Sequence, residues 1–380
     1  MVQLTSALLT GLVGLAGIAF AHPGHDVKAE AAERAAFLKR APIESRSLAH
    51  CAAKLKARGH EDASIARRER TVQEIRRRNG IQARSFLKAR DLASVTNTSH
   101  LSTLEGVTPE TDPSILFASN GTCILAPDVT QGPYYVTGEL IRNNIVEDQE
   151  GVPLYMDIQL IDTNTCEPVP DVFMDLWHCN ATGVYSGIVA NGNGNSADSS
   201  NLNTTFLRGL QKTDSDGVVQ FQSIFPGHYT SRATHIHVLT HPINETIVQE
   251  NNTISGLYIS HSSHVGQLFF DQDLISKVEA TSPYTSNTQE LTENTDDSIL
   301  AEEADTIDPM MEYVFLGDDI SDGIFAWASV GIDTTEDNSV TPAAYYTEDG
   351  GVENESSGMG GGSGPSGAPP SGTAVPSGAF

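Results

Sequence analysis

The stretch Val218-Val-Gln-Phe-Gln-Ser-Ile-Phe-Pro-Gly-His-Tyr-Thr-Ser-Arg-Ala-Thr-His-Ile-His-Val-Leu239 contains two strand-like runs joined by a turn. The runs 218–224 and 235–239 are rich in β-branched and other apolar residues, and Pro226-Gly227 separates them. Directly upstream, Asp214-Ser-Asp-Gly217 has the composition of a tight turn, because Asp caps such a turn and Gly adopts its left-handed backbone. This part of the chain therefore predicts neighbouring β-strands.

The same pattern extends in both directions from this stretch. Further strand-like runs, of which the last two form a predicted hairpin, are Leu154–Ile161, Val172–Trp177, Gly266–Phe270, Tyr313–Leu316 and Gly323–Trp327. Many short strands without intervening helices are typical of all-β proteins. The sequence therefore predicts a mainly β protein, an antiparallel β-sandwich, over residues 96–335.

The segments that flank this region differ from it in composition. Residues 28–90 hold 17 Lys and Arg against 7 Asp and Glu, whereas the rest of the chain holds 5 against 42. The acidic bulk argues against nucleic acid as a partner, because phosphates would be repelled. Residues 22–95 are predicted as a short basic helical segment, either a pro-segment with dibasic sites or a helical hairpin packed on the acidic core. Residues 336–380 are predicted as a flexible, disordered Gly/Ser/Pro-rich tail.

The N-terminus predicts secretion. Residues 1–21 have the apolar run and the Ala19-Phe20-Ala21 cleavage signal of a signal peptide, and no further stretch predicts a membrane anchor. Sequons for N-glycosylation, which agree with an extracellular location, occur at Asn97, Asn120, Asn180, Asn203, Asn244, Asn251 and Asn354.

Four cysteines can form two disulfides in three ways. An extended strand over 172–178 would carry Cys179 about 20 Å along the chain, at about 3.3 Å per residue, so a Cys166–Cys179 bond is disfavoured. Of the two remaining pairings we take Cys51–Cys166 with Cys123–Cys179 as the working prediction.

The pair His235 and His237 predicts metal-binding chemistry. Residues at i and i+2 of a strand point to the same face, so both imidazoles can meet one ion. Cupins also use His-x-His, but they follow it closely with a Glu ligand, and residues 238–241 here are Val-Leu-Thr-His. Tyr229 and Arg232 lie shortly before the pair, and Tyr185 ends an earlier Gly-containing turn.

These residues belong to a longer ordered pattern. It comprises Gly132-Pro-Tyr134, Asp175-x-Trp177, Gly183-x-Tyr185, Asp214-x-Asp-Gly217, Pro226-Gly-x-Tyr229 and Arg232-x-x-His235-x-His237. The pattern resembles the signature of the intradiol ring-cleavage dioxygenases, a non-haem Fe(III) family that includes catechol 1,2-dioxygenases and protocatechuate 3,4-dioxygenases. The resemblance covers about residues 105–275, and the secretion signals make the chain similar to the extracellular fungal branch.

The resemblance implies a role for each site residue. Tyr185, Tyr229, His235 and His237 would be the Fe(III) ligands, and phenolate oxygen suits this hard cation. Tyr229 would leave the metal and take a proton when substrate binds. Arg232 would stabilise developing negative charge, Gln267 would be the family's active-site glutamine, and Tyr134 would line the substrate pocket.

The implied reaction joins a catechol-type aromatic to O₂. It opens the bond between the two hydroxylated carbons and gives a cis,cis-muconate-type diacid. Because residues 91–380 contain only five Lys and Arg, catechol, hydroxyquinol or alkylcatechols are expected rather than protocatechuate. Family resemblance also suggests a homodimer through the N-terminal helices. The alternative from another class is a metal-free prealbumin-like or adhesin-type sandwich that binds a ligand, which would not need Tyr229 and the His pair together.

Overall fold

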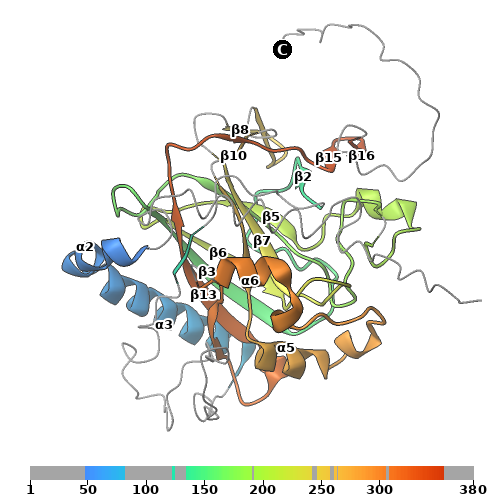
Figure 1. Cartoon of the computed structure of the whole chain (residues 1–380), viewed down its shortest axis with the longest axis horizontal. Helices are drawn as coiled ribbons and strands as arrows, with labels where there is room; N and C mark the ends of the chain where they lie inside the picture. Colours follow the sequence, from blue (N-terminus) through green and yellow to red (C-terminus); the bar gives the residue numbers. More distant parts are fainter. Residues whose placement is uncertain are drawn as a thin grey trace, which may run out of the picture.

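The computed structural model describes residues 48–81, 122–124, 134–190, 192–241, 246–256, 261–262, 264–304 and 308–354. Two β-sheets pack against each other, and a long helix covers one of them (Figure 1). The predicted fold class, a mainly β sandwich with few helices, is confirmed. The predicted signal peptide and most of the remaining N-terminal segment lie outside the described residues.

The first sheet has the strand order β1-β13-β3-β6, with β12 paired to β13. Its strands are β1 (Thr122–Ile124), β3 (Pro153–Asp162), β6 (Val218–Ile224), β12 (Glu312–Phe315) and β13 (Ile324–Ile332). β3 pairs antiparallel with β6, and β12 with β13, as a hairpin predicts. The purely antiparallel prediction needs one correction, because β13 runs parallel to both β3 and β1. A parallel neighbour requires a long connection, and β13 begins more than 160 residues after β3 ends.

The second sheet is antiparallel and has the order β11-β7-β4-β5. Its strands are β4 (Phe173–Trp177), β5 (Arg208–Lys212), β7 (His235–His241) and β11 (His264–Phe269). Smaller sheets join β2 (Val136–Thr137) to β15 (Ala344–Thr347) and β16 (Gly350–Glu353), β8 (Thr246–Val248) to β9 (Ile254–Gly256), and β10 (His261–Ser262) to β14 (Asn338–Ser339).

The main hydrophobic core lies between the two sheets. Alternate side chains of β3, β6 and β13 meet alternate side chains of β4 and β7, including Met156, Phe221, Leu176 and Val238. The helix α5 (Gln272–Glu279) adds apolar side chains to this core, and in Figure 1 it lies at the end away from β15 and β16. The opposite face of the second sheet carries a separate cluster that contains several tyrosines, and this second cluster surrounds the candidate site.

The basic helices pack on the outer face of the first sheet. After η2 (Leu48–Cys51) come α2 (Ala52–Ala57) and α3 (His60–Asn79), which are separated at Gly59, whose φ of 68° is left-handed. Apolar side chains of α3 such as Val72 contact β3, β12 and β13. Arg67 and Arg68 form ion pairs with the buried Asp157 of β3. In the part of the basic segment that the structure describes, two helices follow each other, and α3 packs on the β domain of its own chain.

One of the two predicted disulfides is present. Cys51 and Cys166 are bonded and join η2 to the loop after β3. The predicted Cys123–Cys179 bond is wrong, because Cys179 is a buried free thiol that donates to the carbonyl of Gly227, 3.3 Å away. Cys123 lies on β1 of the first sheet, whereas Cys179 follows β4 of the second sheet.

The C-terminal part also differs from the prediction. Residues 338–353, placed in the flexible tail, form β14, β15 and β16 instead. β15 pairs in parallel with β2, and Val340 and Ala344 pack into the tyrosine-rich cluster. Residues 355–380 lie outside the described part of the chain. Among the described residues, no helix has the length and apolar composition needed to cross a bilayer.

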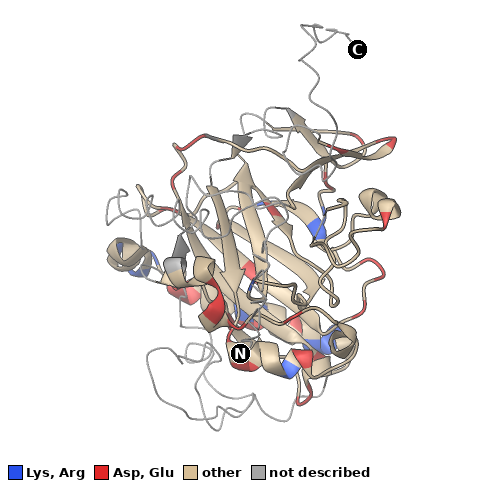
Figure 2. Cartoon of the chain, turned by 45° about the vertical axis from the view of Figure 1, so that its right-hand side comes forward, with Lys and Arg blue, Asp and Glu red and all other residues tan. Residues whose placement is uncertain are grey.

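The remaining helical elements form connections. They are η3 (Ser199–Asn203), η6 (Tyr284–Ser286), η7 (Asn294–Asp296), α6 (Ser298–Ala304) and η8 (Ile320–Asp322). Acidic positions recur along the loops and helices, whereas Lys and Arg positions are fewer (Figure 2).

Candidate metal centre

Strand β7 places the predicted histidine ligands on the outer face of the second sheet. Ile236 and Val238 enter the core between the sheets, so His235 and His237 point the other way. His237 lies directly opposite Trp177 on β4 and Gln267 on β11. The Trp177 and His237 rings stack with centroids 4.9 Å apart and planes 2° apart, which fixes the imidazole plane.

Tyr229 reaches the site from the turn that precedes β7. The turn begins at Pro226, and a Cβ at Gly227 would lie 2.5 Å from the carbonyl oxygens of Asn180 and Ala181. Only glycine allows this close approach of two backbone segments. The signature Pro-Gly-x-Tyr thus positions the phenol by tight backbone packing.

Tyr185 is held by its backbone. Its N–H donates to Asn193 Oδ1 over 2.7 Å, and its carbonyl accepts from Asn193 Nδ2 at 2.8 Å and from Asn201 Nδ2 at 2.7 Å. Both asparagines are buried. These bonds leave the phenol of Tyr185 directed into the tyrosine-rich cluster, where its ring lies 5.5 Å from that of Tyr229 and 6.0 Å from that of His237.

The polar atoms of this set converge. Tyr229 Oη lies 3.2 Å from His235 Nε2, which lies 3.0 Å from His237 Nε2. The other nitrogen of His235, Nδ1, lies 2.6 Å from the carbonyl of Ala233, so a proton on Nδ1 would leave the lone pair of Nε2 to coordinate a metal ion. The structure therefore brings all four predicted ligand residues together from a loop, a turn and a strand.

The burial of these groups indicates what they could hold. The four side chains are between 1% and 3% exposed. Burial, and next the proximity of Tyr229, raises the pKa of the Tyr185 phenol well above its ordinary value. Burial also raises the pKa of Tyr229, although the Arg232 charge opposes the change. Clustering such polar groups in a dry site is costly unless a ligand satisfies them. Two phenols and two imidazoles are a donor set that fits a ferric ion.

Arg232 lies beside this set and is fixed by two partners. Its Nε donates to Asp297 Oδ2 over 2.9 Å, and its Nη2 donates to Gln267 Oε1. Asp297 also accepts from the N–H groups of Ala233, Ile299 and Leu300. Burial alone would raise the pKa of Asp297, but the Arg232 charge and these backbone donors lower it. Arg232 and Gln267, both predicted site residues, are thus in direct contact.

Tyr134 lies on top of the two predicted phenol ligands. Its ring stacks on Tyr185 at 4.5 Å and meets Tyr229 edge-on at 6.0 Å. Gly132 and Pro133 of the same motif lie outside the described residues. The placement agrees with a pocket-lining tyrosine, a role that stays a prediction.

The sequence did not reveal the carboxylate partners of the buried cations. Asp297 lies 65 positions after Arg232, and Glu139 lies 69 positions before Arg208, its partner at 3.2 Å. No local pattern connects such pairs. The available signal was the scarcity of Lys and Arg in the β region, which marked Arg232 and applies equally to Arg208.

Comparisons with known proteins agree with this site. A family model described as "Dioxygenase" matches residues 129–304, which include every predicted site residue. A search of curated proteins found no match. The solved structures that resemble the chain include an intradiol ring-cleavage dioxygenase from Tetranychus urticae, with 28% identity, 56% of this chain and 96% of that chain covered, and a TM-score of 0.44.

Two further structures are more distant. A hydroxyquinol 1,2-dioxygenase from Pseudomonas putida DLL-E4 has 15% identity, 55% and 67% coverage and a TM-score of 0.33. A catechol 1,2-dioxygenase from Acinetobacter sp. ADP1 has 16% identity, 55% and 60% coverage and a TM-score of 0.32.

The family match places residues 129–304 in the dioxygenase family. It confirms the predicted enzyme class, an intradiol ring-cleavage dioxygenase, and disfavours the alternative of a metal-free binding sandwich.

Proposed function

We propose that this chain is a secreted non-haem Fe(III) enzyme that cleaves catechols between their two hydroxylated carbons. The observation that carries the proposal is the convergence of the polar atoms of these side chains. His235 Nε2 lies 3.2 Å from Tyr229 Oη and 3.0 Å from His237 Nε2, which are hydrogen-bond distances, and the ring of Tyr185 lies 5.5 Å from that of Tyr229. A structural role alone gives no reason to collect these four polar side chains in one buried place.

Each residue has a role in this proposal. Tyr185, Tyr229, His235 and His237 would hold Fe(III). The chemistry that Fe(III) would supply when held there is coordination by both oxygens of the substrate, which would activate the ring toward O₂. Tyr229 Oη would accept one substrate proton, which suits a phenol whose burial favours the neutral form.

The neighbours of the ligands would serve the substrate. Arg232, held rigid by Asp297 and Gln267, would stabilise negative charge that develops on the ring. The ring of Tyr134 would form a wall of the pocket and orient the substrate by stacking. Together these side chains exclude water from the reacting centre, because all of them are buried.

The paired state of the cations favours substrates without a ring carboxylate. Four of the five described Lys and Arg of the β region are in ion pairs, namely Arg208 with Glu139, Arg232 with Asp297, Arg142 with Glu147 and Lys212 with Asp171. The fifth, Lys277 on α5, lies over the Phe315 ring. A carboxylate entering the site would have to compete with a carboxylate already in place. We therefore propose catechol, hydroxyquinol or alkylcatechols as substrates and muconate-type diacids as products.

Secretion and relationship to the fungal extracellular branch are also part of the proposal. The Cys51–Cys166 disulfide supports an oxidising compartment. Asn203 and Asn251 are exposed sequons, whereas Asn180 Nδ2, the atom to which a glycan would attach, donates to Gln149. N-terminal sequencing of protein secreted by a eukaryotic host tests this part, with His22 as the expected first residue. A mature chain that keeps residues 1–21 would contradict it.

A homodimer through the N-terminal helices stays a prediction. The apolar face of α3 packs on β3, β12 and β13 of its own chain, so a dimer would have to use other surfaces.

The deciding experiment combines metal analysis, colour and oxygen uptake on one purified sample. We expect about one iron per chain, a broad visible band from phenolate-to-Fe(III) charge transfer, and O₂ consumption with catechol that exceeds the rate with protocatechuate. Tyr185→Phe should lose the band or the iron. Tyr313→Phe is the matched control, because Tyr313 is equally buried but lies in the core between the sheets, and it should keep both.

Two results would refute the proposal. Colourless protein with stoichiometric iron would exclude phenolate ligation. Wild-type protein that cannot be loaded with iron and consumes no O₂ with any catechol would exclude the ferric enzyme.

A further inference from the structure

Arg208 is a buried cation on the same face of the second sheet as the predicted ligands. It lies opposite Trp177, and Trp177 lies opposite His237. Directly paired residues of neighbouring strands share a face, so Arg208, Trp177 and His237 form one row. Arg208 is the first residue of β5, the edge strand of this sheet, which β4 separates from β7. Its side chain is nevertheless only 2% exposed.

The guanidinium of Arg208 binds two carbonyl groups from different segments. Its Nη2 lies 2.7 Å from the carbonyl oxygen of Tyr134 and 2.8 Å from that of Ser186. Its Nε donates to the Ser186 carbonyl and to Ser186 Oγ, each over 3.0 Å. Ser186 directly follows Tyr185, so Arg208 ties the backbone of the pocket tyrosine to the residue next to a predicted ligand.

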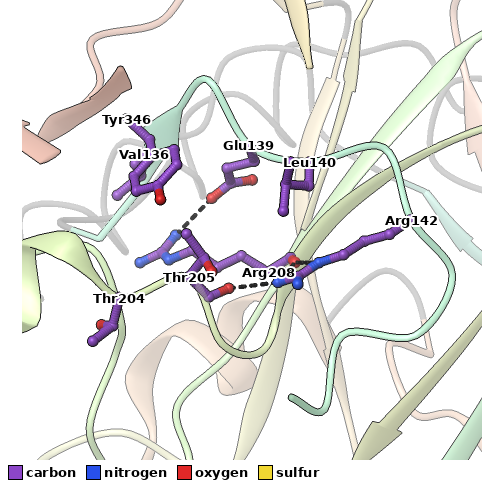
Figure 3. A pocket seen from close by; sticks show the side chains of 8 residues that line it. All are labelled: Val136, Glu139, Leu140, Arg142, Thr204, Thr205, Arg208 and Tyr346. Atoms are coloured by element: carbon purple, nitrogen blue, oxygen red, sulfur yellow. Dashed lines mark hydrogen bonds and ion pairs between the residues drawn. The ribbon is translucent and has the colours of Figure 1, made fainter. Parts of the chain in front are cut away.

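A carboxylate completes the arrangement. Glu139 Oε1 lies 3.2 Å from Arg208 Nη1, and Figure 3 shows the two side chains facing each other at a small hollow. Burial, and next the neighbouring Asp175, raises the pKa of Glu139, which Arg208 opposes. Glu139 comes from the same segment as Tyr134, so the pair adds a second link between β5 and that segment.

The hollow itself is too small for a second ligand. Its volume is about 10 Å³, which is room for about one water molecule. Its lining residues are Val136, Glu139, Leu140, Arg142, Thr204, Thr205, Arg208 and Tyr346. The role of Arg208 therefore follows from its hydrogen bonds to the backbone at Tyr134 and Ser186, and not from a ligand bound in this hollow.

We propose that Arg208 is a positioning residue that fixes the phenol of Tyr185 and the ring of Tyr134 relative to each other. The two rings stack at 4.5 Å, and each belongs to a segment whose carbonyl the same guanidinium binds. Arg suits this task because its planar fork donates in several fixed directions, whereas Lys is a single flexible point charge. The inference rests on the proposed function for the role of Tyr185 as a metal ligand.

The test compares Arg208→Lys with Arg142→Lys. Arg142 borders the same hollow (Figure 3). Its guanidinium, however, donates to the carbonyls of Thr205 and Arg208 and to Glu147. Its bonds therefore do not reach the two tyrosine segments. We expect Arg208→Lys to bind Fe(III) about 10-fold to 100-fold more weakly, in line with the loss of a partner that orients a ligand. Its visible band should shift, and Arg142→Lys should match the wild type in both.

Near-ultraviolet circular dichroism of the metal-free proteins gives an independent readout of the tyrosine stack. A changed tyrosine signal in Arg208→Lys but not in Arg142→Lys supports the inference. If Arg208→Lys fails to fold, the double variant Glu139→Gln, Arg208→Met replaces it, because this variant removes both charges of the ion pair.

The outcomes separate the two proposals. Coloured, active wild-type protein together with an Arg208→Lys variant of unchanged iron affinity, band and tyrosine signal would overturn the positioning role alone. A colourless wild type with stoichiometric iron would refute the proposed function, and the circular dichroism comparison would still decide whether Arg208 orders the tyrosines.

Discussion

Replacing Asp157 tests whether α3 is an integral part of the domain. Asp157 on β3 has no exposed surface and accepts from Arg67 Nε and Nη2 at 2.9 and 2.8 Å and from Gln220 at 2.8 Å. Arg68, also without exposed surface, lies 3.6 Å away and packs over the Trp327 ring. Asp157→Asn would leave these two guanidinium groups without their carboxylate and turn an amide donor toward them.

The expected cost follows from the burial of the pair. Removing one partner of a buried ion pair costs about 3–5 kcal/mol. At about 2–4 °C of melting temperature per kcal/mol for a domain of this size, the variant should melt about 6–20 °C lower. The matched control is Asp171→Asn, because Asp171 pairs with Lys212 at 2.8 Å but both side chains are more than half exposed. An exposed pair of this kind contributes at most about 1 kcal/mol.

The pH dependence gives a second signature. Burial alone would raise the pKa of Asp157, but its bonds and charge interactions with Arg67 and Arg68 lower it. A carboxyl whose pKa is lower in the folded state stabilises the fold above its unfolded pKa of about 3.9. This stabilisation is lost as the pH falls through the folded pKa. The difference between wild type and Asp157→Asn should therefore be constant at pH 6–8 and shrink below about pH 4.

Thermal and urea unfolding of both variants, at one salt concentration, measure these differences. An equal loss of stability in Asp157→Asn and Asp171→Asn, each below about 1 kcal/mol, would contradict an integral role of α3. Trypsin digestion adds a check, since the Arg67-Arg68 bond should be cut faster in Asp157→Asn than in the control.

Two further changes test the site and the disulfide. Asp297→Asn should lower kcat about 10-fold to 100-fold, because Arg232 loses its charged partner. Iron content and the visible band should stay as in the wild type. An unchanged kcat would count against the role of Arg232. Cys51→Ser opens a loop closed by a bond between residues 115 positions apart and should cost about 2–5 kcal/mol in urea unfolding. Reduction of the wild type should have the same effect, and a smaller loss than 1 kcal/mol in both would contradict it.

Local patterns predicted most of the strands and the main turn. The run 218–224 coincides with β6, and the predicted strand at 235–239 is the first part of β7. The Asp214 side chain accepts from the N–H groups of Asp216 and Val218, and Gly217 has a φ of 74°, as the turn chemistry requires. Such features depend on residues close in sequence, so single-sequence reasoning can detect them.

Features that depend on distant residues were missed. The parallel pairing of β13 with β3 and the pairing of β15 with β2 leave no local signature. The Gly-rich composition from residue 350 onward also obscured the short strands β14, β15 and β16, the last of which begins at Gly350. In the site, the strand spacing indicated the histidine pair and the family resemblance supplied the roles of the tyrosines, but Asp297 and Glu139 were found only through their contacts.

The family match ends earlier in the chain than the folded domain does, as the strand order of the first sheet shows. The match ends at residue 304, yet β13 lies between β1 and β3 in the first sheet and pairs with β3 along the whole length of β13. Without β12 and β13, one edge of β3 and much of the main core would face water. The two predicted histidine ligands lie on β7 of the other sheet, whose inner side chains pack against that same core. All predicted site residues therefore lie within residues 129–304, but the rigidity that would hold the four predicted ligands together depends on strands that follow them.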